Sequence, residues 1–247
     1  VNLIATGKKE EDPIIECAGA IGYGEKVFVT AKFPEPIRLA GNNNDPVDMY
    51  IVFSTSHDGK GAVNVMITPV RVVCNNMLNL AFKQNSGRLS LRHTRYISDR
   101  LDLMNKENAK MAYQTLNLYN TYKTYFEESL NDLANKKLTD AQIKDVIAKI
   151  TLPDEAFKIY KEKGNVEHED ISTRARNQFY SIMNSLDYGV GQEVGEKGTG
   201  LWLINGITTH YQNTEDWKGK DEKKYNSLTE GMVQSRLQTA YDYLRAA

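Results

Sequence analysis

The feature that most constrains the fold is a long stretch without glycine or proline, from Ser98 to Ala134. Within and beside it, apolar side chains recur every three or four positions, which is the spacing of one face of an α-helix. These side chains are Ile97, Leu101, Met104, Ala112, Tyr119, Tyr122, Phe126, Leu130 and Leu133. At its full extent such a helix is roughly 55 Å long, so it is long for a globular domain.

The chain before this helix has the pattern of β-strands. The strand-like runs are residues 16–21, 26–33, 47–56 and 62–72. Glycines at 22 and 24, and again at 59 and 61, mark the turns between paired runs, because glycine adopts positive φ readily. Residues 72–83 then show helical spacing and residues 88–94 alternate again, so we predict a short helix followed by a short strand.

The chain after residue 134 predicts further helices. Thr139 can cap a helix that ends at Ile150, and Pro153 suits the first turn of another that ends near Gly164. Later helices are predicted at residues 170–186, 199–212 and 229–247, with a glycine-rich linker at 189–200. We therefore predict an α+β fold, with an antiparallel sheet of hairpins in the N-terminal half and a helical C-terminal half.

We expect the β-rich part, residues 1–97, and the helical part, residues 98–247, to form one continuous structural unit. Because the chain begins with Val1 rather than Met, we also expect an N-terminal segment of the full protein to precede it.

The overall charge and the cysteine usage exclude several classes of protein. With 31 Lys+Arg against 32 Asp+Glu, the net charge of −1 excludes a uniformly basic nucleic-acid binder but leaves room for a local basic face. Only 2 cysteines, Cys17 and Cys74, cannot form a dense disulfide framework and fit a reducing compartment. No apolar stretch approaches the ~20 residues that span a bilayer, and no signal peptide is recognisable. We expect a cytoplasmic protein that makes no membrane contact.

One short motif places a hydroxyl, an imidazole and a carboxylate side by side: Ser56, His57 and Asp58. A catalytic triad needs these groups to converge, whereas neighbours on one strand point to opposite faces. A hairpin turn in which Asp58 bonds its own backbone is therefore the favoured interpretation, and a hydrolase remains an alternative.

The histidines and glycines do not indicate a cofactor. The four histidines include no pair with the i, i+4 spacing of a helical metal site. The glycines of residues 189–195 are wrongly spaced for a dinucleotide fingerprint, and residues 195–200 lack the ending of a phosphate loop. We predict neither a metal nor a nucleotide cofactor.

The strongest functional signal is a basic segment between residues 71 and 100. Arginine dominates it, and the planar guanidinium suits phosphate. Its candidate phosphate contacts are Arg71, Lys83, Arg88, Arg92 and Arg95, with Tyr96 as a stacking surface for a base. The alternative is a sheet face neutralised by acids of the long helix, namely Asp102, Glu107, Glu127 or Glu128.

Tyrosines also crowd the long helix, at Tyr113, Tyr119, Tyr122 and Tyr125. Such a stripe is typical of a core or of a contact between copies of a chain. An interface along part of this helix is therefore a second hypothesis, and it predicts a homo-oligomer or a protein partner.

Two motifs, at residues 54–62 and 68–81, resemble the paired signatures of the phage/plasmid-like protein family, a domain of unknown function found on bacteriophages, plasmids and integrated elements. The resemblance covers about residues 16–134. It implies a bacterial host cell but brings no catalytic residues. Arg71 and Asn75 lie one turn apart in the second motif, and this corner can bind an anion or pin a helix to the sheet. Asn76 belongs to the same motif without an assigned role.

The predicted order of a hairpin, two strands and a helix is similar to the core of phage single-strand annealing proteins, which hold single-stranded DNA in a basic groove of a ring or filament. This fold-level analogy implies DNA handling without a cofactor: single-strand binding or annealing. The alternative is an accessory factor of a mobile element that binds a host-defence or replication protein through the long helix.

Overall fold

The structure, a computed structural model, describes residues 13–21, 23–39, 42–57, 62–71, 76–77, 88–91, 106–192, 196–218, 221–229 and 231–246. The chain folds into two compact units. Unit 1 comprises Val1–Arg38, Pro46–Val72 and Ala81–Glu128, and unit 2 comprises Leu39–Asp45, Val73–Leu80 and Ser129–Ala247.

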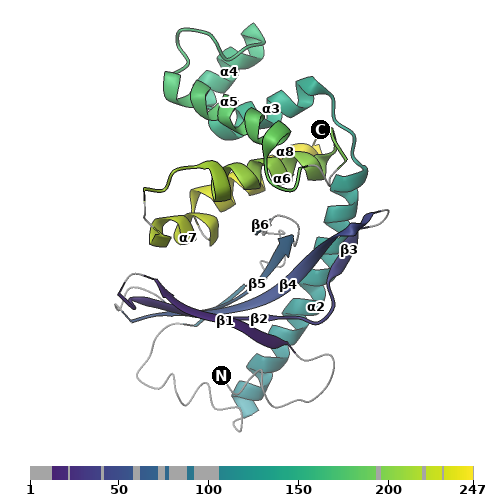
Figure 1. Cartoon of the computed structure of the whole chain (residues 1–247), viewed down its shortest axis with the longest axis vertical. Helices are drawn as coiled ribbons and strands as arrows, with labels where there is room; N and C mark the ends of the chain where they lie inside the picture. The colour runs from purple at the N-terminus through teal and green to yellow at the C-terminus, as the bar shows by residue number, and fades with distance from the viewer. Residues whose placement is uncertain are drawn as a thin grey trace. The chain divides into compact units, whose positions relative to one another are not determined.

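Unit 1 is built on an antiparallel sheet (Figure 1). Its strands are β1 (Ile14–Ile21), β2 (Lys26–Lys32), β3 (Ile37–Leu39), β4 (Asn42–Ser56), β5 (Val63–Arg71) and β7 (Arg88–Leu91). The order is β1-β2-β4-β5, with β7 paired to β5 and β3 paired to β4. The predicted antiparallel sheet and its hairpins are confirmed.

The two faces of this sheet differ in chemistry. Directly paired residues of antiparallel strands share a face, so the register assigns one apolar set to a single side. This set includes Val29, Ala31, Met49, Ile51, Val65 and Ile67. Phe33 continues the same side, because its N–H donates to the Met49 carbonyl. The sheet therefore has one hydrophobic face that must be covered.

Helix α2 (Lys106–Asn135) covers that face (Figure 1). The Tyr119 ring stacks on Phe33 with centroids 3.7 Å apart. Tyr122 and Phe126 are buried, and each such side chain stabilises the fold by about 1.5–3 kcal/mol. The 30-residue helix is about 45 Å long. It confirms the predicted long helix from Lys106 onward, and residues 98–105 lie outside the described residues.

Unit 2 is helical. Its elements are α3 (Asp140–Thr151), α4 (Asp154–Lys163), α5 (Thr173–Tyr188), α6 (Gly200–Thr209), the π-helical turn η1 (His210–Thr214), α7 (Asp221–Thr229) and α8 (Met232–Ala246). All of α6 is buried, and it packs against α5 and α8. The described parts of the chain thus confirm the predicted α+β class.

Local signals in the sequence set several of these helix ends. Thr139 and Gln142 form a reciprocal capping box at the start of α3. Gly164 ends α4 with a φ of 74°, where a side chain would be strained. Helix α5 begins later than predicted, because the Ser172 hydroxyl accepts from the Ala175 N–H and so caps it.

One predicted helix is corrected. Asn76 and Met77, in the middle of the helix predicted over residues 72–83, form the short strand β6. The apolar spacing there is equally compatible with extended backbone over so short a window. Asn75 lies outside the described residues, and of Asn76 only the backbone is described. Helix α7 is an element that the sequence did not predict.

No helix in the described part of the chain is both long enough and apolar enough to cross a membrane.

Candidate functional site

The predicted basic segment begins at the end of β5 and continues through β7. The register pairs Arg71 with Val47, a position of the apolar face, and Arg88 with Met66, a position of the opposite face. The two arginine positions therefore belong to different sides of the sheet, and the sheet face opposite α2 supports Arg88 rather than Arg71. The side chains of these two arginines lie outside the described residues, as do all atoms of Lys83, Arg92, Arg95 and Tyr96. The strand that carries Arg88 is confirmed at Arg88–Leu91, and the phosphate contacts stay predictions.

The face of the sheet opposite α2 is largely polar. By the register its polar residues are Lys26, Thr30, Lys32, Asp48, Tyr50, Ser54, Ser56, Asn64 and Thr68, and they share the face with Phe28, Val52, Met66 and Val70. Across the paired strands, Arg88 of β7 is level with Met66 of β5, Val52 of β4 and Thr30 of β2. Lys26, Ser54 and Asn64, toward the end that adjoins β7, are half-buried, whereas Ser56 at that end is buried, as are Asp48 and Thr68 toward the opposite end. The face is therefore partly buried at both ends.

Two polar contacts occupy the other end of this face. Lys32 Nζ lies 2.5 Å from Asp48 Oδ2, and the Tyr50 hydroxyl donates to Glu16 Oε2 at 2.8 Å. Burial, followed by this hydrogen bond, raises the pKa of Tyr50 above its usual range, so the phenol stays protonated. The charge of Lys32 is thus offset within the sheet, and this lysine is poorly placed to contribute positive charge to a ligand.

The Ser-His-Asp motif lies at the end of β4. Ser56 is buried and His57 is exposed, as expected for consecutive strand residues. The His57 N–H donates to the Glu25 carbonyl at 2.7 Å, which extends the pairing of β2 with β4 by one step. Asp58 lies outside the described residues. The described geometry agrees with the hairpin interpretation of this motif.

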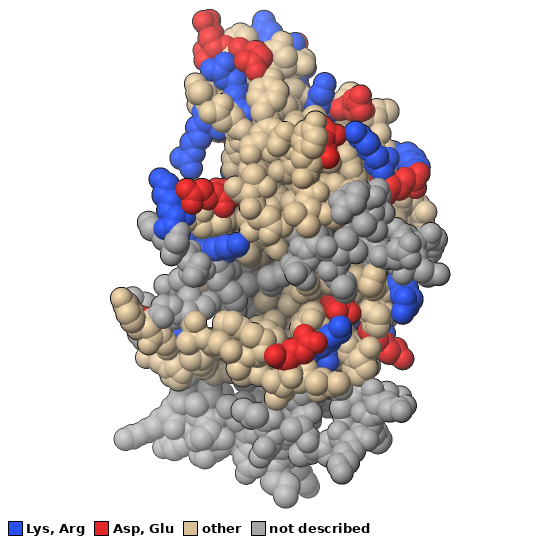
Figure 2. Space-filling view, in the orientation of Figure 1, with Lys and Arg blue, Asp and Glu red and all other residues tan. Residues whose placement is uncertain are grey.

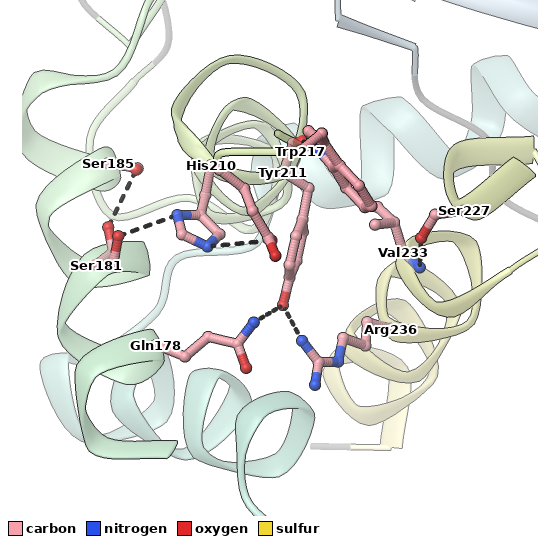
Figure 3. Close-up of polar contacts among 10 residues, drawn as sticks. Gln178, Ser181, Ser185, His210, Tyr211, Trp217, Ser227, Val233 and Arg236 are labelled. Carbon is pink, nitrogen blue, oxygen red and sulfur yellow. Dashed lines mark hydrogen bonds and ion pairs between the residues drawn. The ribbon is translucent and has the colours of Figure 1, made fainter. Parts of the chain in front are cut away.

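A second polar cluster lies inside unit 2, where α5, η1 and α8 meet (Figure 3). The Tyr211 hydroxyl accepts from Arg236 Nη1 at 2.6 Å and from Gln178 Nε2 at 3.5 Å. On the neighbouring residue, His210 Nδ1 lies 3.3 Å from Ser181 Oγ. These side chains come from three separate segments, so no local spacing in the sequence could have revealed the cluster.

Burial determines the protonation of this cluster. Desolvation, assisted by the charge of Arg236, lowers the pKa of His210 to about 4. The imidazole is therefore neutral at neutral pH, and its Nδ1 can accept from the Ser181 hydroxyl. Its Nε2 lies 3.9 Å from Glu215 Oε2, too far for a hydrogen bond. Desolvation raises the pKa of Tyr211 to about 12, although Arg236 opposes the shift.

Metal ligation finds no support among the residues that are described. No group of three or more His, Cys, Asp or Glu side chains there could hold a metal ion. The predicted absence of a metal stays a prediction.

Charges on unit 2 are paired locally. On the face seen in Figure 2, its blue and red side chains lie next to one another rather than in separate patches. The ion pairs are Lys149–Asp154, Lys161–Asp145, Arg176–Glu167, Lys197–Asp187 and Lys137–Glu196. On this face, the described charges of unit 2 are therefore mixed in sign.

The fold and the polar sheet face define a mixed α+β protein whose candidate interface is a sheet rather than an enclosed active site. The chain belongs to a family of domains of unknown function, DUF932, whose model matches residues 3–233. No curated protein and no solved structure matches the chain.

Proposed function

We propose that this chain binds or anneals single-stranded DNA for a phage or plasmid. In this role it acts without a metal or nucleotide cofactor, in the cytoplasm of the bacterial host, and as a homo-oligomer. Arg71, Lys83, Arg88, Arg92 and Arg95 contact phosphate, and Tyr96 stacks on a base.

The observation that carries the proposal is the difference between the two faces of the sheet. Helix α2 covers the apolar face, as the Phe33–Tyr119 stack demonstrates. The opposite face carries lysine, hydroxyl and amide side chains, and the strand of Arg88 pairs with β5 at its side. Hydroxyls and amides donate hydrogen bonds to phosphate and sugar oxygens without reading a sequence, which is the chemistry that an annealing protein needs.

The competing interpretation requires acids of α2 to neutralise the basic segment. Of the acids it invokes, Glu127 and Glu128 have described side chains, half-buried and exposed respectively. The side chains of the basic segment lie outside the described residues, so an ion pair between them and these two carboxylates stays untested there.

The test is fluorescence anisotropy with a labelled oligothymidine, over a series of salt concentrations. The double variant Arg88→Ala/Arg92→Ala should bind more weakly than wild type. Each lost phosphate contact reduces the salt slope by about 0.7 for a single strand, so two reduce it by about 1.4. The matched control, Lys144→Ala/Arg174→Ala, removes the same charge from exposed positions of α3 and α5 and should leave the slope unchanged.

Absence of binding at low salt would overturn the proposal. Equal salt slopes for the double variant and the control would overturn the assignment of the arginines. A complex with a host protein that survives nuclease treatment would instead favour the accessory-factor hypothesis. That hypothesis draws on Tyr125 of α2, which is 44% exposed.

A further inference from the structure

Strand β1 is the outermost strand of the sheet, and its outer edge has no partner strand among the described residues. It is the end of the strand order among the described residues and pairs only with β2 there. Its side chains are largely exposed, with Ile14 at 67% and Ile15 at 42%. An edge strand of eight residues presents unpaired N–H and C=O groups, and proteins normally protect such edges.

The usual protection is weak in β1. The strand contains no lysine, arginine or proline, and its one charge is Glu16. A bulge lies between Ile15 and Cys17, so it interrupts the ladder next to Glu16 and leaves Cys17–Ile21 regular. The Glu16 carboxylate accepts from the Tyr50 hydroxyl across the sheet, which ties its charge to the molecule's own face. The regular part of the edge is therefore uncharged.

Residues 17–21 read Cys-Ala-Gly-Ala-Ile, which is close to symmetric about Gly19. An antiparallel pair of two such strands with its two-fold axis at Gly19 places Ala18 opposite Ala20 and Cys17 opposite Ile21. No like charges then oppose one another, because each Glu16 lies beyond the paired segment. A two-fold interface requires this kind of self-complementarity.

Gly19 is itself fixed by its neighbour on β2. A Cβ at Gly19 would lie 2.7 Å from Cζ of Phe28, so the Phe28 ring occupies the space above the glycine. The centre of the edge segment consequently has no side chain of its own, which permits close approach of a second backbone.

From these observations we infer that β1 is a homodimer interface: Cys17–Ile21 pairs antiparallel with the same segment of a second copy about Gly19, and the two sheets join into one. The inference stands without the proposed DNA binding, because it predicts a dimer in the absence of DNA. If both hold, the joined sheets double the area of the polar face.

The test is a charge swap, measured by analytical ultracentrifugation of the full chain over a concentration series. Wild type should reach twice the mass of the 28.0 kDa chain. In the Ala18→Lys/Ala20→Lys variant, the lysine at position 18 of each copy faces the lysine at position 20 of the other copy. This repulsion should shift the dimer to monomer. Ala18→Lys/Ala20→Glu opposes unlike charges at the same pairs and should restore the dimer. Ala141→Lys, at an exposed position of α3, is the control and should leave the dimer intact.

A second readout does not depend on charged variants. Ile21→Cys places a thiol opposite Cys17 of the other copy, at a separation of about 5 Å between Cα atoms, which a disulfide can bridge. Mild oxidation should give a covalent dimer, and Ile21→Cys/Cys17→Ser should not. A monomeric wild type, a dimer that persists in the Lys/Lys variant, or dissociation of the Lys/Glu variant would each overturn the inference. DNA binding by a monomeric wild type would overturn it, together with the proposed homo-oligomeric state, while leaving the proposed DNA binding standing.

Discussion

The buried imidazole of His210 should make unit 2 sensitive to acid. His210 is 4% exposed. Burial, together with the charge of Arg236, lowers the pKa of the imidazole from the ordinary 6.5 to about 4. The unfolded chain therefore binds a proton at a pH where the folded chain does not. Stability is fully present above about pH 6.5 and is lost as the pH falls toward 4.

The magnitude follows from the size of the pKa shift. A difference of about 2.5 units at 1.36 kcal/mol per unit corresponds to about 3 kcal/mol of unfolding free energy. Between the two pKa values the slope approaches 1.4 kcal/mol per pH unit. This loss is a large fraction of the stability of an ordinary domain, which is about 5–15 kcal/mol.

The assay is urea unfolding followed by tryptophan fluorescence at several pH values between about 7 and 4. Both tryptophans, Trp202 and Trp217, belong to unit 2, so the signal reports that unit. His210→Gln removes the titrating group and should flatten the pH slope by one proton, whatever its effect on stability at neutral pH. His57→Gln, at an exposed histidine, is the control. A wild-type slope in His210→Gln would refute the reasoning.

Two further substitutions test the packing and capping of unit 2. Gly206→Ala would place a methyl in steric overlap with Leu186 Cδ2 where α5 and α6 pack, and should destabilise the unit by about 1–3 kcal/mol in urea unfolding. An increase in stability, from the higher helix propensity of alanine, would show that the crossing relaxes. Thr139→Ala removes the capping box of α3 and should cost about 1 kcal/mol, whereas Thr139→Ser keeps the hydroxyl and should cost less. Equal losses would contradict the role of the cap.

The features predicted correctly from the sequence are those that local chemistry determines. Strand alternation with glycine turns located β1, β2, β4 and β5, because these signals depend on neighbouring residues alone. The helix cap at Thr139 and the helix end at Gly164, whose backbone is left-handed, are likewise determined by residues at most four positions apart. The helix predicted over residues 72–83 was wrong at residues 76–77, because a window of one or two turns cannot distinguish helical from extended spacing.

The polar cluster of unit 2 could not be predicted, for a different physical reason. Tyr211, Gln178 and Arg236 lie on different elements, and only packing brings them together. His210 was visible in the sequence as a histidine without a helical metal spacing. Its low pKa arises from burial beside Arg236, which depends on the tertiary fold. Sequence patterns therefore locate helices and strands more readily than they reveal the burial and the charges around one side chain.

The near-neutral net charge has a structural explanation that bears on the proposed DNA binding. In the described part of unit 2, five lysine or arginine side chains pair with carboxylates of the same unit. In unit 1, Lys32 and Lys123 are offset by Asp48 and Glu35. The segment from residue 71 to residue 100 contains a single acid, Asp99, among its basic residues. Charges that are already paired contribute little to a field at a distance, so a net charge of −1 does not argue against a local phosphate-binding surface beside β7. The salt slope of the Arg88→Ala/Arg92→Ala variant measures this local excess directly, because counterion release depends on the charges at the contact and not on the sum over the chain.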